Sequence, residues 1–412
     1  MSGVQDEIII IGGGLGGLTT ALALAPSGRR IRLLERASEI APIGYGIQLG
    51  PNVLPLLESL GVGQEVLEAS YFPSALVMLD ATEGELSRVP FDATFKRQFA
   101  GRYLCIHRGD LHEILLGALK HYGNVTLEDS ANVTAYSQTE STVSVSIERG
   151  VTYRAGALIA CDGLNSTLRA KLHPRDTLRQ TGYVAHRTVR AMSDVPALIR
   201  RDEVTLWVDE GHHIIYYPLR DRSLLNIVAV FKSTMADSAL PPAEYKAALQ
   251  THLQKSDPEM RAVLDLMDLE RCWPIGDREP IRHWAQGRVT LLGDSAHATL
   301  QSLAQGAGMA IEDAVTIAAL IEDEQGDYPS AFRRFEASRI LRTARVQLES
   351  RDLWEMYHAG GIARDVRNRT YAQKATQDYY RCFEWLWHPI ELRGSNKQAC
   401  GAAERIDHVV IG

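Results

Sequence analysis

The chain has 412 residues, of which 45% are hydrophobic, and its formal net charge at pH 7 is −7. This acidic balance argues against a nucleic-acid-binding protein, and no run of about eighteen apolar residues is present that could span a membrane. Five cysteines without a C-x-x-C pair or zinc spacing predict no metal site and favour reduced thiols in a cytoplasmic protein. The first predicted strand begins almost at once, so we expect no signal peptide.

The first predicted element is a strand of four consecutive isoleucines, a pattern typical of a strand that is buried on both faces. Gly12, Gly14 and Gly17 follow in the G-x-G-x-x-G spacing, before an Ala/Leu-rich helix. These glycines allow a tight turn, a close approach of the backbone to a pyrophosphate, and close packing of helix on strand. A second strand over 31–34 ends at Glu35, where a carboxylate can bind a ribose 2′-hydroxyl. This order of elements predicts a bound dinucleotide.

The other predicted elements alternate between helical segments and groups of strands. In the first half we expect a helix over 51–60, strand-like residues over 73–105, a helix over 110–121 with Asp110 as N-cap, a hairpin of 143–147 and 151–154, and a buried strand over 157–160. Strands over 204–208, 213–217 and 225–231 follow, and then a helix over 242–253. A buried strand over 289–292, a long helix through 311–321 and helices to about residue 390 complete the prediction. The pattern predicts an α/β fold in which a dinucleotide-binding domain is interrupted by sheet insertions. A ligand is expected in the cleft between the two parts.

Domain boundaries follow from this alternation. We predict a dinucleotide-binding domain in three pieces, over 1–72, 106–180 and 279–345, and a substrate domain in two pieces, over 73–105 and 181–278. C-terminal helices over 346–393 and a mobile tail over 394–412 complete the chain.

Two further Gly/Asp pairs follow predicted buried strands. Asp162-Gly163 closes one strand and Gly293-Asp294 closes another. The ends of strands in an open α/β sheet face the ligand crevice, where Asp294 can accept hydrogen bonds from ribityl or ribose hydroxyls. Each pair alone is more typical of a simple Asp-Gly turn. Together with the N-terminal glycines they favour a ligand site.

These three segments resemble the three signatures of the class A flavoprotein aromatic hydroxylases, and the resemblance covers nearly the whole chain. The resemblance implies the p-hydroxybenzoate hydroxylase fold (GR2-type, with a Rossmann-like FAD domain), non-covalent FAD, and NADH or NADPH as a transient co-substrate. The residues that it assigns to the cofactor are Gly12, Gly14, Leu15, Gly17, Glu35, Arg36, Gln48, Arg108, Asp162, Asp294, Gly306, Ala307, Gly308 and Met309. The last four would meet the isoalloxazine at a helix N-terminus, where the dipole favours negative charge on the reduced flavin.

The stretch 213–220 resembles the family's active-site strand. Strand parity places His213 and Tyr217 on one face and His212 on the other. Parity alone leaves the choice of face open, and without the flavin context a half-buried structural strand would be the simpler interpretation. The resemblance favours the first face, with His213 removing the phenol proton and Tyr217 holding the substrate. It also assigns Gln301 to the substrate carboxylate or hydroxyl.

The resemblance is greatest to hydroxylases of simple hydroxybenzoates and implies use of O2 through a flavin C4a-hydroperoxide. The expected reaction converts 3-hydroxybenzoate to 2,5-dihydroxybenzoate. Two alternatives on the same fold are 1-hydroxylation of salicylate and 3-hydroxylation of 6-hydroxynicotinate, both with loss of CO2. A non-catalytic flavin- or hydroxyaromatic-binding sensor is an alternative of another class. The oligomeric state stays open, with a homodimer as one candidate.

One residue departs from the family pattern. The family usually has proline after the histidine of Gly-Asp-x-Ala-His, and this chain has Ala298. The change concerns the loop over the flavin rather than FAD binding itself. His297 could act as a base, although a structural histidine after the Asp turn is the simpler interpretation. The aromatic run over 379–387 is expected to pack at an interface between helices.

Overall fold

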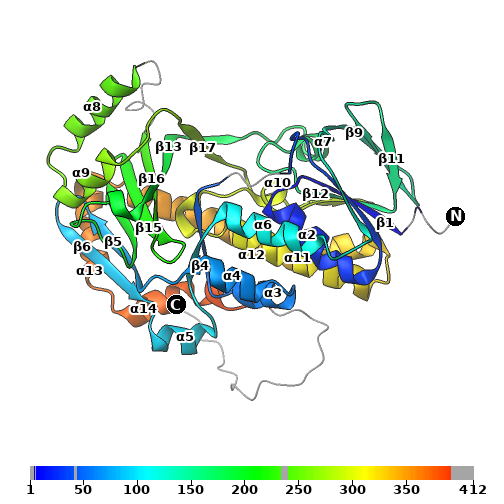
Figure 1. The fold of residues 1–412 in the computed structure, drawn as a ribbon, viewed down its shortest axis with the longest axis horizontal. Helices are drawn as coiled ribbons and strands as arrows, with labels where there is room; N and C mark the ends of the chain where they lie inside the picture. Colours follow the sequence, from blue (N-terminus) through cyan, green and yellow to red (C-terminus); the bar gives the residue numbers. More distant parts are fainter. Residues whose placement is uncertain (1–3, 5, 41–43, 233–239, 391–412) are drawn as a thin grey trace, which may run out of the picture.

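The computed structural model describes residues 4, 6–40, 44–232 and 240–390. It has two large sheets, one in each half of the molecule (Figure 1). The long helix α12 (Tyr328–Tyr357) packs on both halves, because its N-terminal part lies against the first sheet's core and Trp354 lies in an apolar cluster of the second. Over the described residues, no helix is long and apolar enough to cross a membrane.

The first sheet is six-stranded and mostly parallel. Its order is β18 (Ala285–Gln286), β19 (Val289–Leu291), β12 (Ala157–Ala160), β1 (Glu7–Ile11), β2 (Arg30–Leu34) and β8 (Val125–Glu128), with only β18 antiparallel to its neighbour. The four isoleucines of β1 are at most 7% exposed, because β1 is central and packs in one apolar core with Leu18, Val143 and Ile311.

Two helices pack closely on this sheet. α2 (Leu15–Leu24) begins directly after the glycine turn, and α11 (Gly306–Asp323) lies beside it (Figure 1). A Cβ atom built on Gly16 would lie 3.4 Å from Cβ of Ala310, so small residues set this helix–helix distance. The close packing brings the N-termini of both helices to the same end of the sheet.

The second sheet is seven-stranded. Its order is β17 (Trp273–Asp277), β13 (Arg179–Ala191), β16 (Leu224–Lys232), β15 (His212–Leu219), β14 (Val204–Asp209), β5 (Ala75–Asp80) and β6 (Gly84–Pro90), with only β14 and β5 parallel. One face packs against α8 (Pro242–His252) and α9 (Pro258–Asp265) to form a core of its own. The other face lies toward the first half of the molecule.

Two three-stranded sheets complete the fold. One sheet joins β3 (Gly46–Leu49), β7 (Leu104–His107) and β4 (Ser70–Tyr71), and the other joins β11 (Thr152–Ala155), β10 (Val143–Ile147) and β9 (Val133–Gln138). The chain therefore leaves the first sheet after β2, returns for β8 and β12, leaves again for β13 to β17, and returns for β18 and β19. The α/β fold class with an interleaved sheet domain is confirmed, whereas the individual domain boundaries stay predictions.

Several predicted elements are corrected. The region 73–105 is not all strand, because α5 (Ala93–Phe99) forms inside it. Asp92 caps this helix by accepting hydrogen bonds from the backbone of Thr94 and Phe95. Phe95 and Phe99, one turn apart, bury their rings against C-terminal aromatic residues. Helical packing therefore overrides the strand-like composition.

Three other boundaries differ. The helix α6 (Arg108–Leu119) starts before Asp110, because His107 is its N-cap and accepts a hydrogen bond from Gly109 N. Asp110 lies instead in its first turn and pairs with Arg220. The helix expected over 51–60 is reduced to α3 (Leu54–Ser59), and β9 adds a third strand to the predicted hairpin.

The C-terminal region is helical as predicted. It consists of α12, α13 (Gly361–Ala372) and α14 (Thr376–Trp387), and the aromatic run lies on α14. Trp387 packs edge-on against Phe95 at a ring distance of 5.2 Å and stacks on Phe383 at 4.6 Å. The aromatic side chains thus pack between helices. Of the tail predicted over 394–412, all residues lie outside the described part of the chain.

Candidate active site

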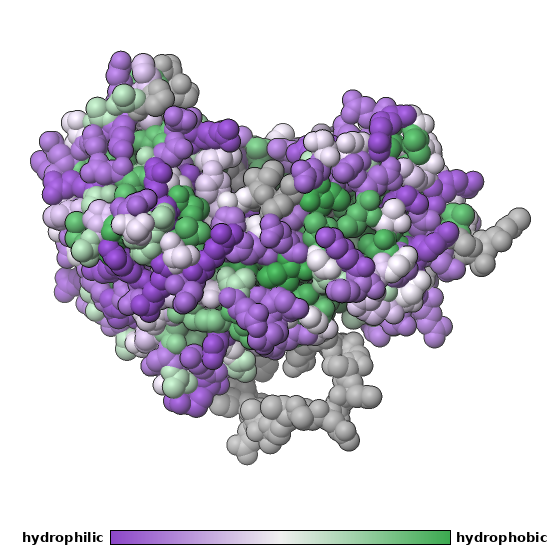
Figure 2. Space-filling view, viewed as in Figure 1, coloured by the Kyte–Doolittle hydropathy of each residue, from purple (hydrophilic) through white to green (hydrophobic). Residues whose placement is uncertain are grey.

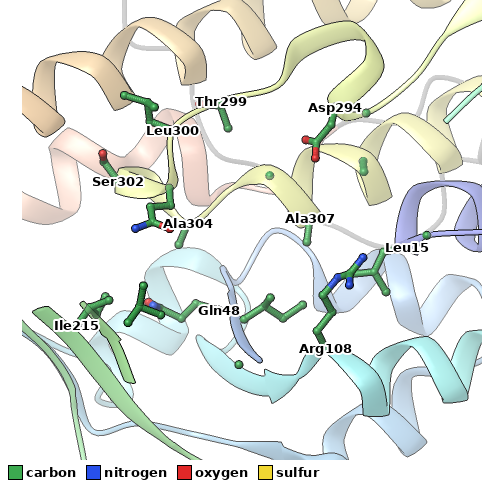
Figure 3. A pocket seen from close by; sticks show the side chains of 18 of the residues that line it. Leu15, Gln48, Arg108, Ile215, Asp294, Thr299, Leu300, Ser302, Ala304 and Ala307 are labelled. Carbon is green, nitrogen blue, oxygen red and sulfur yellow. The ribbon is translucent and has the colours of Figure 1, made fainter. Parts of the chain in front are cut away.

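A cavity of about 450 Å³ lies between the two large sheets. On the face seen in Figure 2, hydrophilic side chains cover most of the surface, and hydrophobic ones reach it in the middle, where α2 and α11 lie, and in smaller patches elsewhere. The walls come from both halves of the chain (Figure 3). Of the residues predicted from the sequence, those that line the cavity are Gly14, Leu15, Gln48, Arg108, His213, Tyr217, Asp294, Gln301, Gly306 and Ala307.

The glycine turn after β1 forms one end of the cavity. Gly12 has a φ of +102°, and a Cβ atom on it would lie 2.3 Å from the carbonyl oxygen of Cys161. A Cβ atom on Gly17 would lie 1.9 Å from the carbonyl oxygen of Gly12. Both glycines therefore serve the fold of the turn and do not line the cavity. Gly14 differs, because its nearest atom is Arg108 Nη2 at 4.0 Å, so the space in front of it is open.

Glu35 lies at the end of β2, beside the glycine turn. Its Oε2 accepts a hydrogen bond from Gly13 N at 2.6 Å and its Oε1 accepts one from Ala37 N at 2.8 Å. The carboxylate is thus held at the rim of the cavity, although Glu35 does not line it. Arg36 is exposed and is not brought to the cavity.

Asp294 and Arg108 face the cavity from opposite sides (Figure 3). Asp294 is the first residue of α10 (Asp294–His297), and Gly293 takes a φ of +65° to turn the chain out of β19. Burial raises the pKa of Asp294, an effect that the charges of His297 and Arg108 oppose. Burial likewise lowers the pKa of the Arg108 guanidinium, which Asp294 opposes. The two side chains therefore supply an acceptor and a cation to one cavity.

The N-terminus of α11 reaches the cavity between these two side chains. Gly306 and Ala307 form its first turn and line the wall. Backbone N–H groups in the first turn of a helix lack intrahelical partners and carry positive dipole charge. Gly308 and Met309 follow in the helix but do not line the cavity. Met309 is fully buried, with its sulfur 3.6 Å from Nη2 of Arg339.

Asp162 also lies beside the cavity rather than in its wall. Its Oδ2 accepts a hydrogen bond from Thr167 N at 2.9 Å, while its neighbours Cys161 and Gly163 line the cavity. Burial raises the pKa of the Cys161 thiol. The thiol is therefore protonated at neutral pH and is a poor nucleophile.

The other end of the cavity is formed by β15. His213, Ile215 and Tyr217 line it, whereas Ile214 and Tyr216 belong to the core on the other face of the sheet. The parity predicted from the sequence is observed, and the structure places the His213 face toward the cavity. His212 instead stacks on Phe231 at a ring distance of 5.8 Å.

His213 is 2% exposed and held on several sides. Its Nδ1 lies 2.8 Å from Nε2 of His358, the residue that follows α12. The rings of Trp354 and Tyr357 meet it edge-on. Burial, and then the neighbouring His358, lower the pKa of His213 well below its usual range. His213 is therefore neutral at pH 7, and Nε2 is the ring nitrogen left to face the cavity.

Gln301 and Arg187 form a polar pair in the wall. Nη2 of Arg187 donates a hydrogen bond to Oε1 of Gln301 at 3.1 Å. The Gln301 Nε2 atom is buried and has no hydrogen-bond partner among the described residues. Arg187 lies on β13 and makes no salt bridge within the part of the chain that the structure describes. Burial lowers its pKa, yet a guanidinium stays charged at any ordinary pH. This pair leaves one cation and one amide donor available to a ligand.

Arg187 is the site residue that the sequence reasoning missed. The stretch 183–191 alternates between the two faces of β13, and Arg187 stands on the face opposite to His186 and Thr188. The strand also carries Arg179, His186, Thr188 and Arg190, so no local signal singled out Arg187. The neighbour that marks it as part of a polar pair, Gln301, is 114 residues away.

Comparison with known proteins identifies the chain. Residues 5–332 match the FAD binding domain family. The chain is 37% identical to 3-hydroxybenzoate 6-hydroxylase of Polaromonas naphthalenivorans (strain CJ2), over 92% of this chain and 95% of that one. The chain belongs to the FAD-dependent aromatic hydroxylases. It is thus a flavoprotein monooxygenase that acts on an aromatic ring, as the sequence predicted.

Two further relatives extend the comparison. The 6-hydroxynicotinate 3-monooxygenase of Bordetella bronchiseptica (strain ATCC BAA-588 / NCTC 13252 / RB50) is 32% identical, over 84% of this chain and 91% of that one. The solved structure of Klebsiella pneumoniae HpxO complexed with FAD and uric acid superimposes with a TM-score of 0.83 at 24% identity, covering 93% of this chain and 97% of that one. The latter supports the same fold.

The residues at the dinucleotide end of this hydroxylase fit FAD. The open space at Gly14, beside the N-terminus of α2, suits a pyrophosphate. The carboxylates of Glu35 and Asp294 could accept hydrogen bonds from ribose and ribityl hydroxyls, and Arg108 adds a cation to the cavity wall. The first turn of α11, with its positive dipole end, suits the electron-rich edge of the FAD isoalloxazine ring. Bound there, FAD supplies the redox chemistry and the activation of O2.

His297 has a structural position in this hydroxylase. Its Nε2 lies 2.6 Å from Oδ2 of Asp313, and it does not line the cavity. Ala298, where the family usually has proline, has a φ of −48°, close to the value that proline imposes. The loop therefore keeps an extended backbone without the proline ring. No group of three or more His, Cys, Asp or Glu in the described ranges is arranged to hold a metal ion.

Proposed function

We propose that the chain hydroxylates 3-hydroxybenzoate para to its hydroxyl group, giving 2,5-dihydroxybenzoate, with NADH or NADPH and O2 as co-substrates. The observation that carries the proposal is the polarity of the substrate end of the cavity. A neutral histidine, His213, lies in the same wall as the cation Arg187 and the amide of Gln301. A phenol and a carboxylate on one ring match these groups.

Arg187 favours an anionic substrate. Arg187 is half-buried in the cavity wall, so its interaction with a carboxylate is screened less than it would be at the open surface. The free Nε2 of Gln301 can donate a hydrogen bond to a second oxygen of the ligand. The relatives named 3-hydroxybenzoate 6-hydroxylase also support a hydroxybenzoate.

His213 is the proposed base. Its Nε2 accepts the proton as the phenol O–H bond breaks, and the phenolate that results carries more charge on the ring carbons ortho and para to its oxygen. Tyr217 orients the ring from the same strand face, because burial raises its pKa and keeps its hydroxyl protonated. Leu206, Ile215 and Leu300 add apolar walls that limit access of water.

A substrate panel tests the proposal. Purified FAD-loaded protein is mixed with NADH or NADPH and with 3-hydroxybenzoate, salicylate or 6-hydroxynicotinate, and NAD(P)H oxidation, O2 uptake and product mass are measured. The expected result is oxidation stimulated by 3-hydroxybenzoate and a product that carries one atom of 18O from 18O2. Release of CO2 from salicylate or 6-hydroxynicotinate would favour a decarboxylating hydroxylase instead. Binding without NAD(P)H consumption would indicate a sensor.

Two further properties are proposals of the same kind. A cytoplasmic location agrees with the reduced cysteines expected from the sequence. A homodimer is the assembly that we propose first, and light scattering of the purified protein measures it directly.

A further inference from the structure

We infer that Gln48 binds the substrate's carboxylate through its amide N–H, and that Tyr103 is the positioning residue that orients this amide. The inference rests on the proposed function, because it concerns an aromatic carboxylate in the same cavity. The family resemblance assigns Gln48 to the cofactor, so the inference also changes the part of the cavity to which this residue belongs.

The first observation is the position of Gln48, which reaches the cavity from β3 (Figure 3). The backbone N–H of Gly46, on the same strand, donates a hydrogen bond to Oδ1 of Asn226 at 2.7 Å, so β3 is tied to β16. A Cβ atom on Gly46 would lie 2.7 Å from Cε2 of Tyr217. Alternate side chains of a strand share one face, so Gln48 stands on the same side of β3 as the Tyr217 ring.

The second observation is a buried hydrogen bond that fixes the orientation of the amide. The Tyr103 hydroxyl donates to Oε1 of Gln48 at 2.7 Å. Tyr103 stacks on Phe91 at a ring distance of 4.5 Å and makes no other side-chain hydrogen bond within the described part of the chain. If the amide were turned over, the buried hydroxyl hydrogen would lose its acceptor, which is unfavourable. Oε1 is therefore held toward Tyr103, and Nε2 is the atom left to face the cavity.

Gln301 is oriented in the same way. Its Oε1 accepts a hydrogen bond from Nη2 of Arg187 at 3.1 Å, and its Nε2 is buried without a partner among the described residues. A protein donor thus occupies the oxygen of each glutamine, and each turns an amide N–H toward the cavity. Gln48 and Gln301 also line a second, smaller cavity of about 90 Å³, so both stand where the two spaces adjoin.

The donors form one connected set around Tyr217. Burial is the main cause that raises the pKa of Tyr217, and both Arg187 and the Gln48 side chain oppose it, as a cation and an N–H donor do. The wall therefore presents two amide donors, a protonated hydroxyl and a cation. A carboxylate offers two oxygens that accept several hydrogen bonds, whereas a neutral phenol offers one oxygen. This set of donors consequently favours a ring carboxylate.

The test uses two ligands that each carry one functional group of the substrate. Benzoate has the carboxylate and 3-methylphenol has the phenol, and the dissociation constant of each from oxidised holoenzyme is measured by the change in flavin absorbance. Gln48→Met removes the amide at similar size, and Tyr103→Phe removes the hydroxyl but keeps the ring on Phe91. Tyr380→Phe is the matched control, because Tyr380 donates an equally short hydrogen bond, 2.7 Å to the Pro90 carbonyl, in the same aromatic cluster but lines neither cavity.

Gln48→Met should weaken benzoate binding by about tenfold or more, with 3-methylphenol binding and flavin content little changed. Tyr103→Phe should weaken benzoate binding by a smaller factor, because the amide can then turn its oxygen toward the carboxylate. Tyr380→Phe should match the parent. Equal losses for the two ligands, parental benzoate affinity in Gln48→Met, no benzoate binding by the parent, or loss of flavin from both variants would overturn the inference.

A double variant separates positioning by Tyr103 from a merely structural role. In the Gln48→Met background, Tyr103→Phe should cause no further loss of benzoate affinity, because the group that it positions is already gone. A further loss as large as that in the parent background would contradict positioning through Gln48. Failure of the parent to consume 3-hydroxybenzoate with NAD(P)H would contradict the proposed function instead, and the binding comparison would still decide the role of Gln48.

Discussion

Nε2 of His297 lies 2.6 Å from Oδ2 of Asp313, and both side chains are at most 2% exposed. Asp313 also accepts hydrogen bonds from Gly293 N at 3.1 Å and from Nε of Arg339 at 2.7 Å. Burial alone would raise the pKa of Asp313, but His297 and Arg339 lower it to about 2. This network ties α11 and α12 to the turn before Asp294. It thus fixes the turn that presents Asp294 to the cofactor site.

Arg339→Met should destabilise the protein strongly. Arg339 is 2% exposed and pairs with both Glu312 and Asp313, so its removal takes one counter-charge from each of two buried carboxylates and leaves Arg342 beside Glu312 and His297 beside Asp313. A loss of about 3–5 kcal/mol is expected for breaking such a buried pair. The midpoint of denaturant unfolding of the holoprotein measures it. Arg334→Met on the same helix is the control, since its ion pairs with Asp323 and Glu324 are exposed. Equal midpoints for the two variants would contradict the prediction.

Gly14→Val should remove FAD without unfolding the chain. Gly14 has a φ of −77° and a ψ of −177°, which valine can adopt, and no atom of the apoprotein blocks the new side chain. The side chain would instead occupy the space assigned to the pyrophosphate. Flavin absorbance per chain should fall to near zero while circular dichroism stays like that of the parent apoprotein. Gly123→Val, at another open position, should keep its flavin. A yellow Gly14→Val protein would show that this assignment is wrong.

The cofactor half of the site could be predicted from sequence because its groups are close together in the chain. The turn from Gly12 to Gly17 and the acid Glu35 follow from local spacing, and parallel strands carry Asp162 and Asp294 to one sheet edge. The substrate half of the site depends on contacts between residues that are far apart in the chain. His213 could be placed on a face by parity, but its contact with His358 joins residues 145 positions apart.

Helix boundaries were the weaker part of the fold prediction. Asp92 is a good N-cap in the sequence, but the aromatic content around it reads equally as strand. The contacts of Phe95 and Phe99 with Trp387, nearly 300 residues later, decide for a helix. Such tertiary contacts have no local signature.

Arg187→Met should weaken binding of the carboxylate substrate. Loss of a hydrogen bond to a charged group typically corresponds to about 1.5–3 kcal/mol, which is roughly 10- to 150-fold in KM for 3-hydroxybenzoate. The KM for a neutral analogue, 3-methylphenol, should change little. Arg190→Met is the matched control, because Arg190 lies on the same strand, on the other face, and donates to the Leu266 carbonyl. If both substrates lost affinity equally, Arg187 would have a structural role instead.

Acidification should destabilise the protein well above the pH at which its carboxylates titrate. Burial is the main cause that lowers the pKa of His212 to about 4, that of His358 to about 3 and that of His213 well below its usual range, and Asp209 opposes the shift of His212. These histidines stay neutral in the folded chain but gain protons in the unfolded chain below about pH 6.5. The unfolded state then binds more protons, so the free energy of unfolding falls as pH falls, by up to about 1.4 kcal/mol per pH unit for each histidine.

Denaturant unfolding of the holoprotein between pH 6.5 and 5 measures this dependence. His358→Gln should reduce the slope against pH, whereas His283→Gln should leave it unchanged, because the His283 side chain is 80% exposed. Asp313 does not interfere, since its lowered pKa of about 2 gives stability that is lost only below about pH 4. Identical slopes in the parent and His358→Gln would contradict the assignment of a buried neutral histidine.

His213→Ala should separate NADH oxidation from hydroxylation. The variant keeps the FAD end of the cavity, which is built from other residues, but loses the base that ionises the phenol. Hydroxylation should slow by about two to four orders of magnitude. More of the O2 consumed should end as H2O2, because a neutral phenol is a weaker nucleophile than a phenolate. Raising the pH should partly restore coupling, since hydroxide in solution then ionises the phenol.

The measurement is the ratio of product formed to NADH consumed, between pH 6 and 9, for His213→Ala and His212→Ala. His212 is the control because it is the adjacent histidine of β15, equally buried, but lies on the face that packs against Phe231. Its replacement should lower stability without changing the ratio or its pH dependence. Equal losses of coupling in the two variants, or a His213→Ala enzyme as coupled as the parent, would exclude His213 as the base. A low ratio in His213→Ala alone, rising with pH, is the outcome that a base on the cavity side of β15 requires.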